Sequence, residues 1–262
     1  MKVGYLQFQP KINCLAENIQ NISFFLNNCE DFDLVVLPEL ANSGYNFSSK
    51  EEALANAEEI NKSKYINALT EICKKRKCHI VSGFCELENG KLYNSSVLIN
   101  EKGVLGVYRK LHLFFNEQDY FEPGNLGLPI FSVNGVKIGM LVCFDWMFPE
   151  VWRILAMKGA DIICHPSNLV LPYAQKAVPI YALTNRVFTI TANRIGTEGD
   201  LKFTGQSVIS DTRGEILCKA SETAEELMFT FIETLDAKNK MITAKNHIFK
   251  SRRPDEYLDL IK

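Results

Sequence analysis

Short apolar runs alternate with segments of helical periodicity along the whole chain. An apolar run of about four to eight residues between Gly, Pro or polar clusters is typical of a buried strand, whereas apolar residues at i, i+3 and i+4 indicate an amphipathic helix. Strands are predicted at Val3–Phe8, Asp33–Leu37, His79–Phe84, Leu92–Ile99, Val104–Tyr108, Ile138–Val142, Asp161–Cys164, Val187–Ala192, Gln206–Ser210, Glu215–Cys218 and Leu227–Ile232. Helices are predicted at Asn18–Asn27, Glu51–Glu59, Tyr65–Lys75, from Pro149 onward, and at Ala174–Arg186.

The connections between these elements predict one domain. Asn100–Gly103 and Asp211–Gly214 place polar residues and a Gly between strand patterns, which indicates two hairpins. Leu111–Gly127 is a long aromatic loop, and long loops in compact domains are usually functional. With no repeat, low-complexity segment or linker, residues 1–262 are expected to form a single α/β domain of two strand-rich layers covered by helices. The last ~30 residues, which are polar, are expected to lie across a surface or a partner.

Composition and charge narrow the possible classes. The 262 residues are 47% hydrophobic and 23% charged, which is ordinary for a globular protein. A net charge of −2 argues against a nucleic-acid partner, and the basic run Lys74–Lys77 is interpreted as the last turn of a helix. No uncharged apolar run reaches the ~18 residues of a membrane span, and no secretory signal precedes the first strand. A cytoplasmic protein without a membrane partner is expected.

The eight cysteines are scattered and include no Cys-x-x-Cys, which indicates reduced thiols in a cytosol. Cys73, Cys78 and His79 are a poor zinc site because no second ligand pair follows at suitable spacing. No metal is therefore expected. Any one of these cysteines, taken alone, is more often a small core residue than a nucleophile.

Three predicted strands each end at a side chain capable of chemistry. Glu39, Lys110 and Cys143 follow buried strands with hardly any loop between, and Cys143 also precedes a helix that Pro149 and Glu150 begin. Reactive groups in open α/β sheets lie at such strand ends. Alone, each has an ordinary explanation as a solvated acid, a surface cation or a core thiol. Together they supply a base, a fixed positive charge and a nucleophile.

Acyl transfer through a thiol needs these three residue types. A free thiol is only a few per cent thiolate at neutral pH, so a nearby carboxylate is needed to accept its proton. An ammonium group then stabilises the oxyanion that forms, a contribution of roughly 3 kcal/mol per donor. Cys with His is the rival arrangement, and His112 and His165 are its candidates. His165 precedes Pro166 and is interpreted as a structural or pocket-wall residue instead of the base.

Three blocks of the sequence resemble the signatures of the nitrilase superfamily, the carbon–nitrogen hydrolases. They are Pro38–Leu40, Tyr108–Leu113 and Val142–Glu150, in that order. Further stretches that resemble family positions are Gly44–Tyr45, Tyr93–Ser95, Phe121–Gly124, Ala192–Gly196 and Gly205–Asp211. The resemblance covers nearly the whole chain. It implies a four-layer αββα sandwich, a homodimer or higher even homo-oligomer, and no metal or organic cofactor.

The resemblance also implies a role for each matching residue. Glu39 would be the general base, Lys110 the cationic stabiliser and Cys143 the nucleophile, while Glu117 would orient the substrate amine or the attacking water. Other matches are pocket-lining or substrate-binding positions. These are Tyr45, Phe144, whose backbone N–H would complete an oxyanion hole, Trp146 and Asn168. The ordinary reading of Glu117 is a surface acid on a loop, and an aromatic beside a nucleophile is as often plain packing.

Two positions depart from the family's pattern. Many relatives carry Arg where Met147 stands and Glu where Thr184 stands. The missing Arg weakens the case for a substrate carboxylate there. The aromatic residues around Cys143 instead resemble the sequences of small amidases and aliphatic nitrilases. The leading hypothesis is an amidase that cleaves a small amide to acid and ammonia through an acyl-thioester. A nitrilase using the same triad is the first alternative, a catalytically idle dimeric scaffold is the second, and acyl transfer to an amine stays open.

Overall fold

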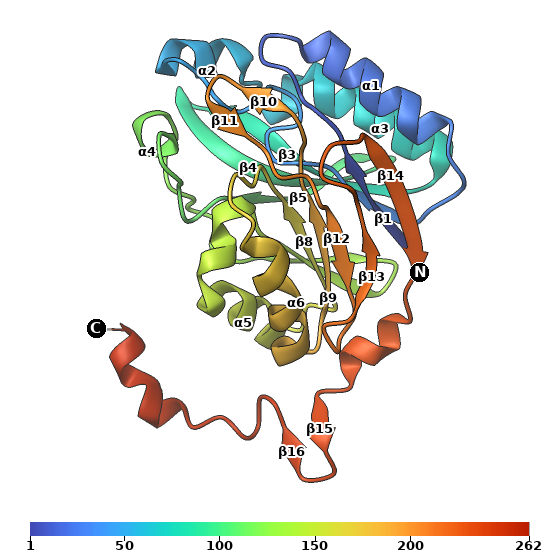
Figure 1. The fold of residues 1–262 in the computed structure, drawn as a ribbon, viewed down its shortest axis with the longest axis vertical. Helices are drawn as coiled ribbons and strands as arrows, with labels where there is room; N and C mark the ends of the chain where they lie inside the picture. The colour runs from blue at the N-terminus through green and yellow to red at the C-terminus, as the bar shows by residue number, and fades with distance from the viewer. Residues whose placement is uncertain (262) are drawn as a thin grey trace.

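Two six-stranded sheets form the centre of the molecule, which a computed structural model describes over residues 1–261 (Figure 1). The first sheet has the order β14 (Glu226–Phe231), β1 (Lys2–Gln7), β2 (Leu34–Val36), β3 (His79–Glu88), β4 (Lys91–Asn100) and β5 (Gly103–Arg109). The second has the order β13 (Ile216–Lys219), β12 (Val208–Ser210), β9 (Phe188–Ala192), β8 (Ile162–Pro166), β7 (Val136–Met140) and β6 (Ile130–Val133). Strands β1, β2 and β3 run parallel in the first sheet, and strands β7, β8 and β9 run parallel in the second.

Helices cover the outer faces of both sheets, which gives the predicted four-layer αββα sandwich. Helices α1 (Leu15–Asn27) and α3 (Lys64–Arg76) pack on the first sheet, and α5 (Pro149–Met157) and α6 (Ala174–Asn185) on the second. The period-two alternation of strand residues explains the layering. In β2, Leu34 and Val36 belong to the core between the sheets, whereas Val35 belongs to the core beneath α1 and α3.

The helix boundaries follow from capping and charge. Ser63 begins α3, because its hydroxyl accepts the backbone N–H of Ile66 at 3.0 Å. The basic residues Lys74–Arg76 occupy the last turn of α3, and Lys77 ends the helix with φ = 53°. The interpretation of this basic run as a helix C-terminus is confirmed. Pro149 and Glu150 occupy the first turn of α5, also as predicted.

Three details correct the predicted elements. The helix predicted at Glu51–Glu59 is α2 (Lys50–Asn56), because Glu58 leaves the helix to form a bridge with Glu86 before the 3₁₀ turn η1 (Ile60–Lys62). Strand β6 was missed, since it is a half-buried edge strand without clear alternation. The loop Leu111–Gly127 contains a short helix, α4 (Glu117–Tyr120). Both hairpins are confirmed: β4 pairs with β5 around Asn100–Gly103, and β12 with β13 around Asp211–Gly214.

The small elements lie outside the two sheets. Strands β10 (Thr197–Glu198) and β11 (Leu201–Lys202) form a short hairpin. After β14 come the 3₁₀ turn η3 (Thr234–Lys238), the hairpin of β15 (Met241–Thr243) and β16 (Asn246–His247), and the 3₁₀ helix η4 (Pro254–Ile261). This terminal segment runs along the end of the sandwich that carries α5 and α6 (Figure 1): the Lys240 ammonium donates to the carbonyls of Asn185 and Arg186, and the Arg252 guanidinium to the sulfur of Met157. Its contact with a partner stays a prediction. Within residues 1–261, every helix is too short or too polar to cross a bilayer.

Candidate active site

The ends of two strands and the loop after the second bring Glu39 and Glu117 into direct contact with Lys110. Glu39 follows β2, Lys110 follows β5 directly, and Glu117 begins α4 in the loop after β5. The Lys110 ammonium donates to Oε1 of Glu39 at 2.7 Å and to Oε1 of Glu117 at 2.7 Å. All three side chains are buried, so these ion pairs form in a medium of low dielectric. Two of the three N–H bonds of the ammonium are thereby used, and one is left for a third acceptor.

Glu39 is held by the sheet around it. Its Oε1 also accepts the side-chain amide of Asn94 at 2.7 Å, and its backbone carbonyl accepts the side-chain amide of Asn168 at 3.0 Å. Gly83 on β3 permits this approach, since a Cβ there would lie 2.3 Å from the Glu39 Cα. The second carboxylate oxygen, Oε2, is buried and has no hydrogen-bond partner among residues 1–261. It can therefore accept a proton.

Cys143 occupies a strained turn between β7 and α5. It begins the 3₁₀ turn η2 (Cys143–Met147) with φ = 42°, a backbone region that non-glycine residues rarely adopt. His165 on β8 supports this turn, because its Nε2 lies 2.9 Å from the Cys143 carbonyl oxygen. A carbonyl only accepts, so this nitrogen carries the proton and donates. Burial lowers the pKa of His165 to about 4, which keeps the ring neutral and agrees with a structural role.

The surroundings of Cys143 favour the protonated form of its thiol. Burial raises its pKa well above the ordinary value, Glu39 raises it further, and Lys110 opposes both. Conversely, burial alone would lower the pKa of Lys110, but the carboxylates of Glu117 and Glu39 raise it above its ordinary value, so the ammonium stays charged. The sulfur is therefore close enough to the ion pair to feel both charges, and it needs a base before it can attack.

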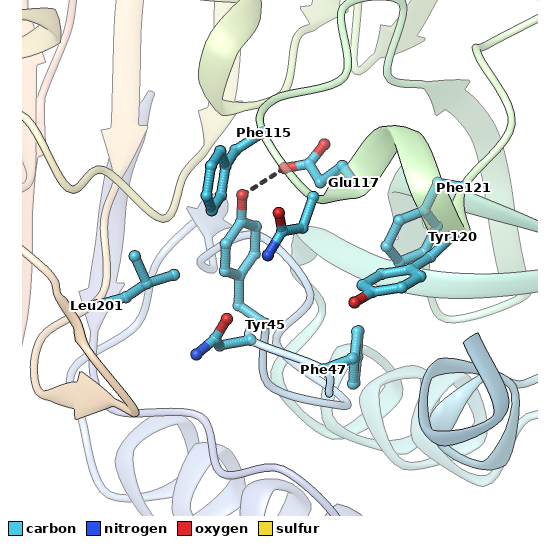
Figure 2. A pocket seen from close by; sticks show the side chains of 9 residues that line it. Tyr45, Phe47, Phe115, Glu117, Tyr120, Phe121 and Leu201 are labelled. Carbon is cyan, nitrogen blue, oxygen red and sulfur yellow. Dashed lines mark hydrogen bonds between the residues drawn. The ribbon is translucent and has the colours of Figure 1, made fainter. Parts of the chain in front are cut away.

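Glu117 is fixed by Tyr45, as Figure 2 shows. The Tyr45 hydroxyl donates to Oε1 of Glu117 at 2.7 Å, the oxygen that also accepts from Lys110. Burial raises the pKa of Glu117 to about 6, with Lys110 lowering it and Glu39 raising it. The alternative of a solvated surface acid is wrong for Glu117, which is 4% exposed. Glu198 in turn accepts the backbone N–H of Tyr45 at 3.0 Å, which holds that segment in place.

An apolar hollow of about 50 Å³ opens beside the sulfur. Its wall contains three of the four predicted pocket residues, Phe144, Trp146 and Asn168, together with Cys143 itself, Phe114, Met147 and residues 169–171. Tyr45 and Glu117 instead line a separate, much smaller cavity of about 10 Å³ (Figure 2). The role of the Phe144 backbone N–H as an oxyanion donor stays a prediction.

Asp145 is a residue of the site that sequence reasoning missed. Its buried carboxylate accepts the Tyr108 hydroxyl at 2.7 Å and the Val142 backbone N–H at 2.9 Å, and its Oδ1 lies 2.7 Å from Nδ1 of His112. It therefore ties the segment that carries Lys110 to the turn that carries Cys143. The signal available in the sequence was its place two residues after the candidate nucleophile. In the structure Asp145 is buried against Trp152, whose indole N–H donates to the Asp145 carbonyl at 3.3 Å.

The charged residues of the site are paired with one another, and no site for a metal is evident. Over residues 1–261, no group of three or more His, Cys, Asp and Glu side chains is arranged to hold a metal ion. All eight cysteines are free thiols. The arrangement places a buried thiol in the wall of an apolar hollow, near a carboxylate with one open oxygen and an ammonium with one open N–H.

Comparison with known proteins places the chain in a family. A sequence model of the family "Carbon-nitrogen hydrolase" matches residues 2–239. The chain is 43% identical to a protein from Pyrococcus abyssi named "Nitrilase", with 98% of this chain and 99% of that one covered. It is 32% identical to an "(R)-stereoselective amidase" from Pseudomonas sp, covering 84% of this chain and 81% of the relative.

Solved structures agree with this comparison. A carbon–nitrogen hydrolase from Helicobacter pylori G27 superposes with a TM-score of 0.89 at 26% identity, covering 100% of this chain and 98% of that one. Nit3 of Saccharomyces cerevisiae, a member of branch 10 of the nitrilase superfamily, superposes with a TM-score of 0.82 at 26% identity, covering 91% and 92%. The chain belongs to the carbon–nitrogen hydrolase family, enzymes of the nitrilase superfamily that hydrolyse carbon–nitrogen bonds other than peptide bonds.

Proposed function

We propose that the protein is a cysteine-dependent amidase that cleaves a small amide to a carboxylic acid and ammonia. The observation that supports this most strongly is the state of Glu39. One oxygen of its carboxylate is held by Lys110 and Asn94, the other is buried and unpartnered, and the charge of this carboxylate raises the pKa of the Cys143 thiol. A buried polar atom without a partner costs stability, so its presence at a reactive centre supports a role in proton transfer.

In the proposed reaction, Sγ of Cys143 attacks the amide carbon while Oε2 of Glu39 takes the thiol proton. The oxyanion receives the third N–H of Lys110 and, as predicted, the backbone N–H of Phe144. The carbon–nitrogen bond then breaks, and Glu39 returns its proton to the leaving nitrogen, which departs as ammonia. Water attacks the thioester with Glu39 again as base, the carbon–sulfur bond breaks, and the acid leaves with the thiol restored.

Glu117 is proposed to orient the amide nitrogen or the attacking water. Its Oε1 is shared by Lys110 and Tyr45, and its Oε2 accepts the backbone N–H of Phe114 at 3.3 Å. A group held at this many points loses little entropy when it positions a substrate. Ammonia release over a panel of amides, with Cys143→Ala as the comparison, tests the proposal. Release that survives this substitution would contradict it.

A nitrilase is the second candidate, because the relative from Pyrococcus abyssi carries that name. The same thiol, carboxylate and ammonium would act on a nitrile carbon through a thioimidate. Matched pairs of amide and nitrile with the same carbon chain separate the two candidates. Faster acid formation from the nitrile would reverse the order proposed here.

The idle scaffold is the third candidate and belongs to another class. An inactive chain has no physical reason to keep a carboxylate and an ammonium paired in its interior, since the desolvation of buried ions is costly. Titration with iodoacetamide tests this: the scaffold gains support if Cys143 reacts no faster than the other seven thiols. We also propose a homodimer or higher even homo-oligomer in the cytoplasm, which sedimentation and cell fractionation would test.

A further inference from the structure

The hollow beside Cys143 defines the chemistry of the group that can occupy it. We propose that the acyl part of the substrate is a short, uncharged, apolar chain. This inference rests on the proposed function, since it takes Cys143 as the atom that the carbonyl approaches.

The wall of the hollow is mostly apolar. Aromatic and aliphatic side chains, among them Phe114, Phe144 and Leu169, form it, and Asn168 and the Cys143 thiol provide its polar atoms. Among the residues that the structure describes, no Asp, Glu, Lys or Arg lines it. A carboxylate or ammonium on the substrate would therefore be desolvated there without a partner. Such a loss lowers reactivity by at least about 100-fold, because a charged group left unpaired costs more than a neutral one.

The charged side chains of the candidate site are already paired with one another. Lys110 lies between the carboxylates of Glu39 and Glu117, with both contacts at 2.7 Å, so it has no full charge to offer a distant substrate carboxylate. Its one open N–H is engaged by the oxyanion in the proposed mechanism. An ionic group at the far end of the acyl chain consequently finds no counter-ion in this site.

The volume sets the length of the chain. The hollow is small, at about 50 Å³, which favours a short acyl chain over a bulky one. The cavity that Tyr45 and Glu117 line is much smaller, at about 10 Å³ (Figure 2). It does not compete for the acyl chain. Met147 and Leu171, which are 47% and 48% exposed, form the open side of the hollow through which a longer chain would reach solvent.

A series of straight-chain amides tests the apolar and length components together. From propionamide to hexanamide, kcat/KM is expected to rise about fourfold per methylene, the factor that corresponds to burial of one CH₂ group. It should level off once the chain fills the hollow, because further carbons then stay in solvent. Two compounds of nearly the same shape as valeramide, namely 4-aminobutyramide and succinamate, should be cleaved at least about 100-fold less efficiently. Equal or better cleavage of either charged compound would overturn the inference.

A positive charge introduced at the open side of the hollow should shift the substrate preference toward an amide that carries a carboxylate. In Leu171→Arg, the ratio of kcat/KM for succinamate to that for valeramide is expected to rise at least about tenfold, since a cation now faces the hollow. Leu105→Arg is the matched control: Leu105 is 42% exposed on β5, five residues before Lys110 and so about 16 Å away along the strand. An unchanged ratio in Leu171→Arg, or the same change in both variants, would contradict the placement of the acyl chain.

Protection of Cys143 from alkylation separates failure of this inference from failure of the proposed function. Valeramide should slow the reaction of Cys143 with iodoacetamide at concentrations where succinamate and 4-aminobutyramide do not. This order of protection supports the inference even if no amide or nitrile releases ammonia, a result that would overturn the proposed function alone. Ammonia release combined with equal or reversed protection would overturn the inference and leave the amidase in place.

Discussion

The buried carboxylate of Glu117 gives a prediction that can be worked from the structure in free energy. Its pKa is raised from 4.5 to about 6, so the folded protein binds a proton at Glu117 over a pH range in which the unfolded chain has released it. Because the pKa is raised on folding, protonated Glu117 stabilises the folded state fully below pH 4.5. This contribution is lost as the pH rises through about 6. At about 1.36 kcal/mol per pH unit, the difference amounts to roughly 2 kcal/mol.

The perturbation is Glu117→Gln, which keeps the size of the side chain and removes its titration. We compare the free energy of unfolding of the native protein with that of the variant at each pH. The difference, native minus variant, is expected to fall by roughly 2 kcal/mol between pH 4 and pH 8. Because only the change with pH is compared, any constant cost of replacing the ion pair with Lys110 cancels. Urea unfolding at a series of pH values, followed by circular dichroism, measures the difference directly.

The control and the refuting result follow from the same comparison. Glu222→Gln removes an exposed carboxylate and measures how much pH dependence a surface glutamate contributes. A difference between native protein and Glu117→Gln that stays constant, or that grows as the pH rises, would refute the reasoning. It would mean that Lys110 and Tyr45 stabilise the ionised form of Glu117 by more than burial disfavours it.

Three further substitutions have expected outcomes. Cys143→Ala should lower kcat by more than about 10³-fold while the free energy of unfolding changes by less than ~1 kcal/mol; near-native ammonia release would contradict the covalent mechanism. Lys110→Met should lower kcat by at least about 10²-fold and destabilise the fold by about 3–5 kcal/mol in urea unfolding, because two buried carboxylates lose their cation. A native unfolding midpoint in this variant would contradict the buried ion pairs. Asp145→Asn should lower kcat roughly 10²-fold with KM nearly unchanged, since it loosens the link between the Lys110 segment and the Cys143 turn; a pure KM effect would argue against a positioning role.

The strand pattern of the sequence was enough to predict most of the sandwich. The parallel strands near the middle of each sheet are buried on both faces, so they read as short continuous apolar runs that end abruptly. Elements at the edges carried weaker signals. Strand β6 is half-buried, and α2 ends earlier than its periodicity indicated, because contacts with β3 redirect the chain at Glu58. Propensity is a weak guide wherever a tertiary contact decides the backbone.

The sequence by itself determined which chemical groups stand at the strand ends: a carboxylate at Glu39, an ammonium at Lys110 and a thiol at Cys143. Only the tertiary structure decided how they meet. The 2.7 Å contacts of Lys110 join residues 71 and 7 positions apart in the chain, and Asp145 reaches a hydroxyl 37 positions away. The apolar hollow likewise combines side chains from three separate segments. The local sequence pattern predicts whether a segment is a helix or a strand and which of its faces is buried. Side-chain contacts, burial and the resulting pKa shifts arise only when distant segments pack together.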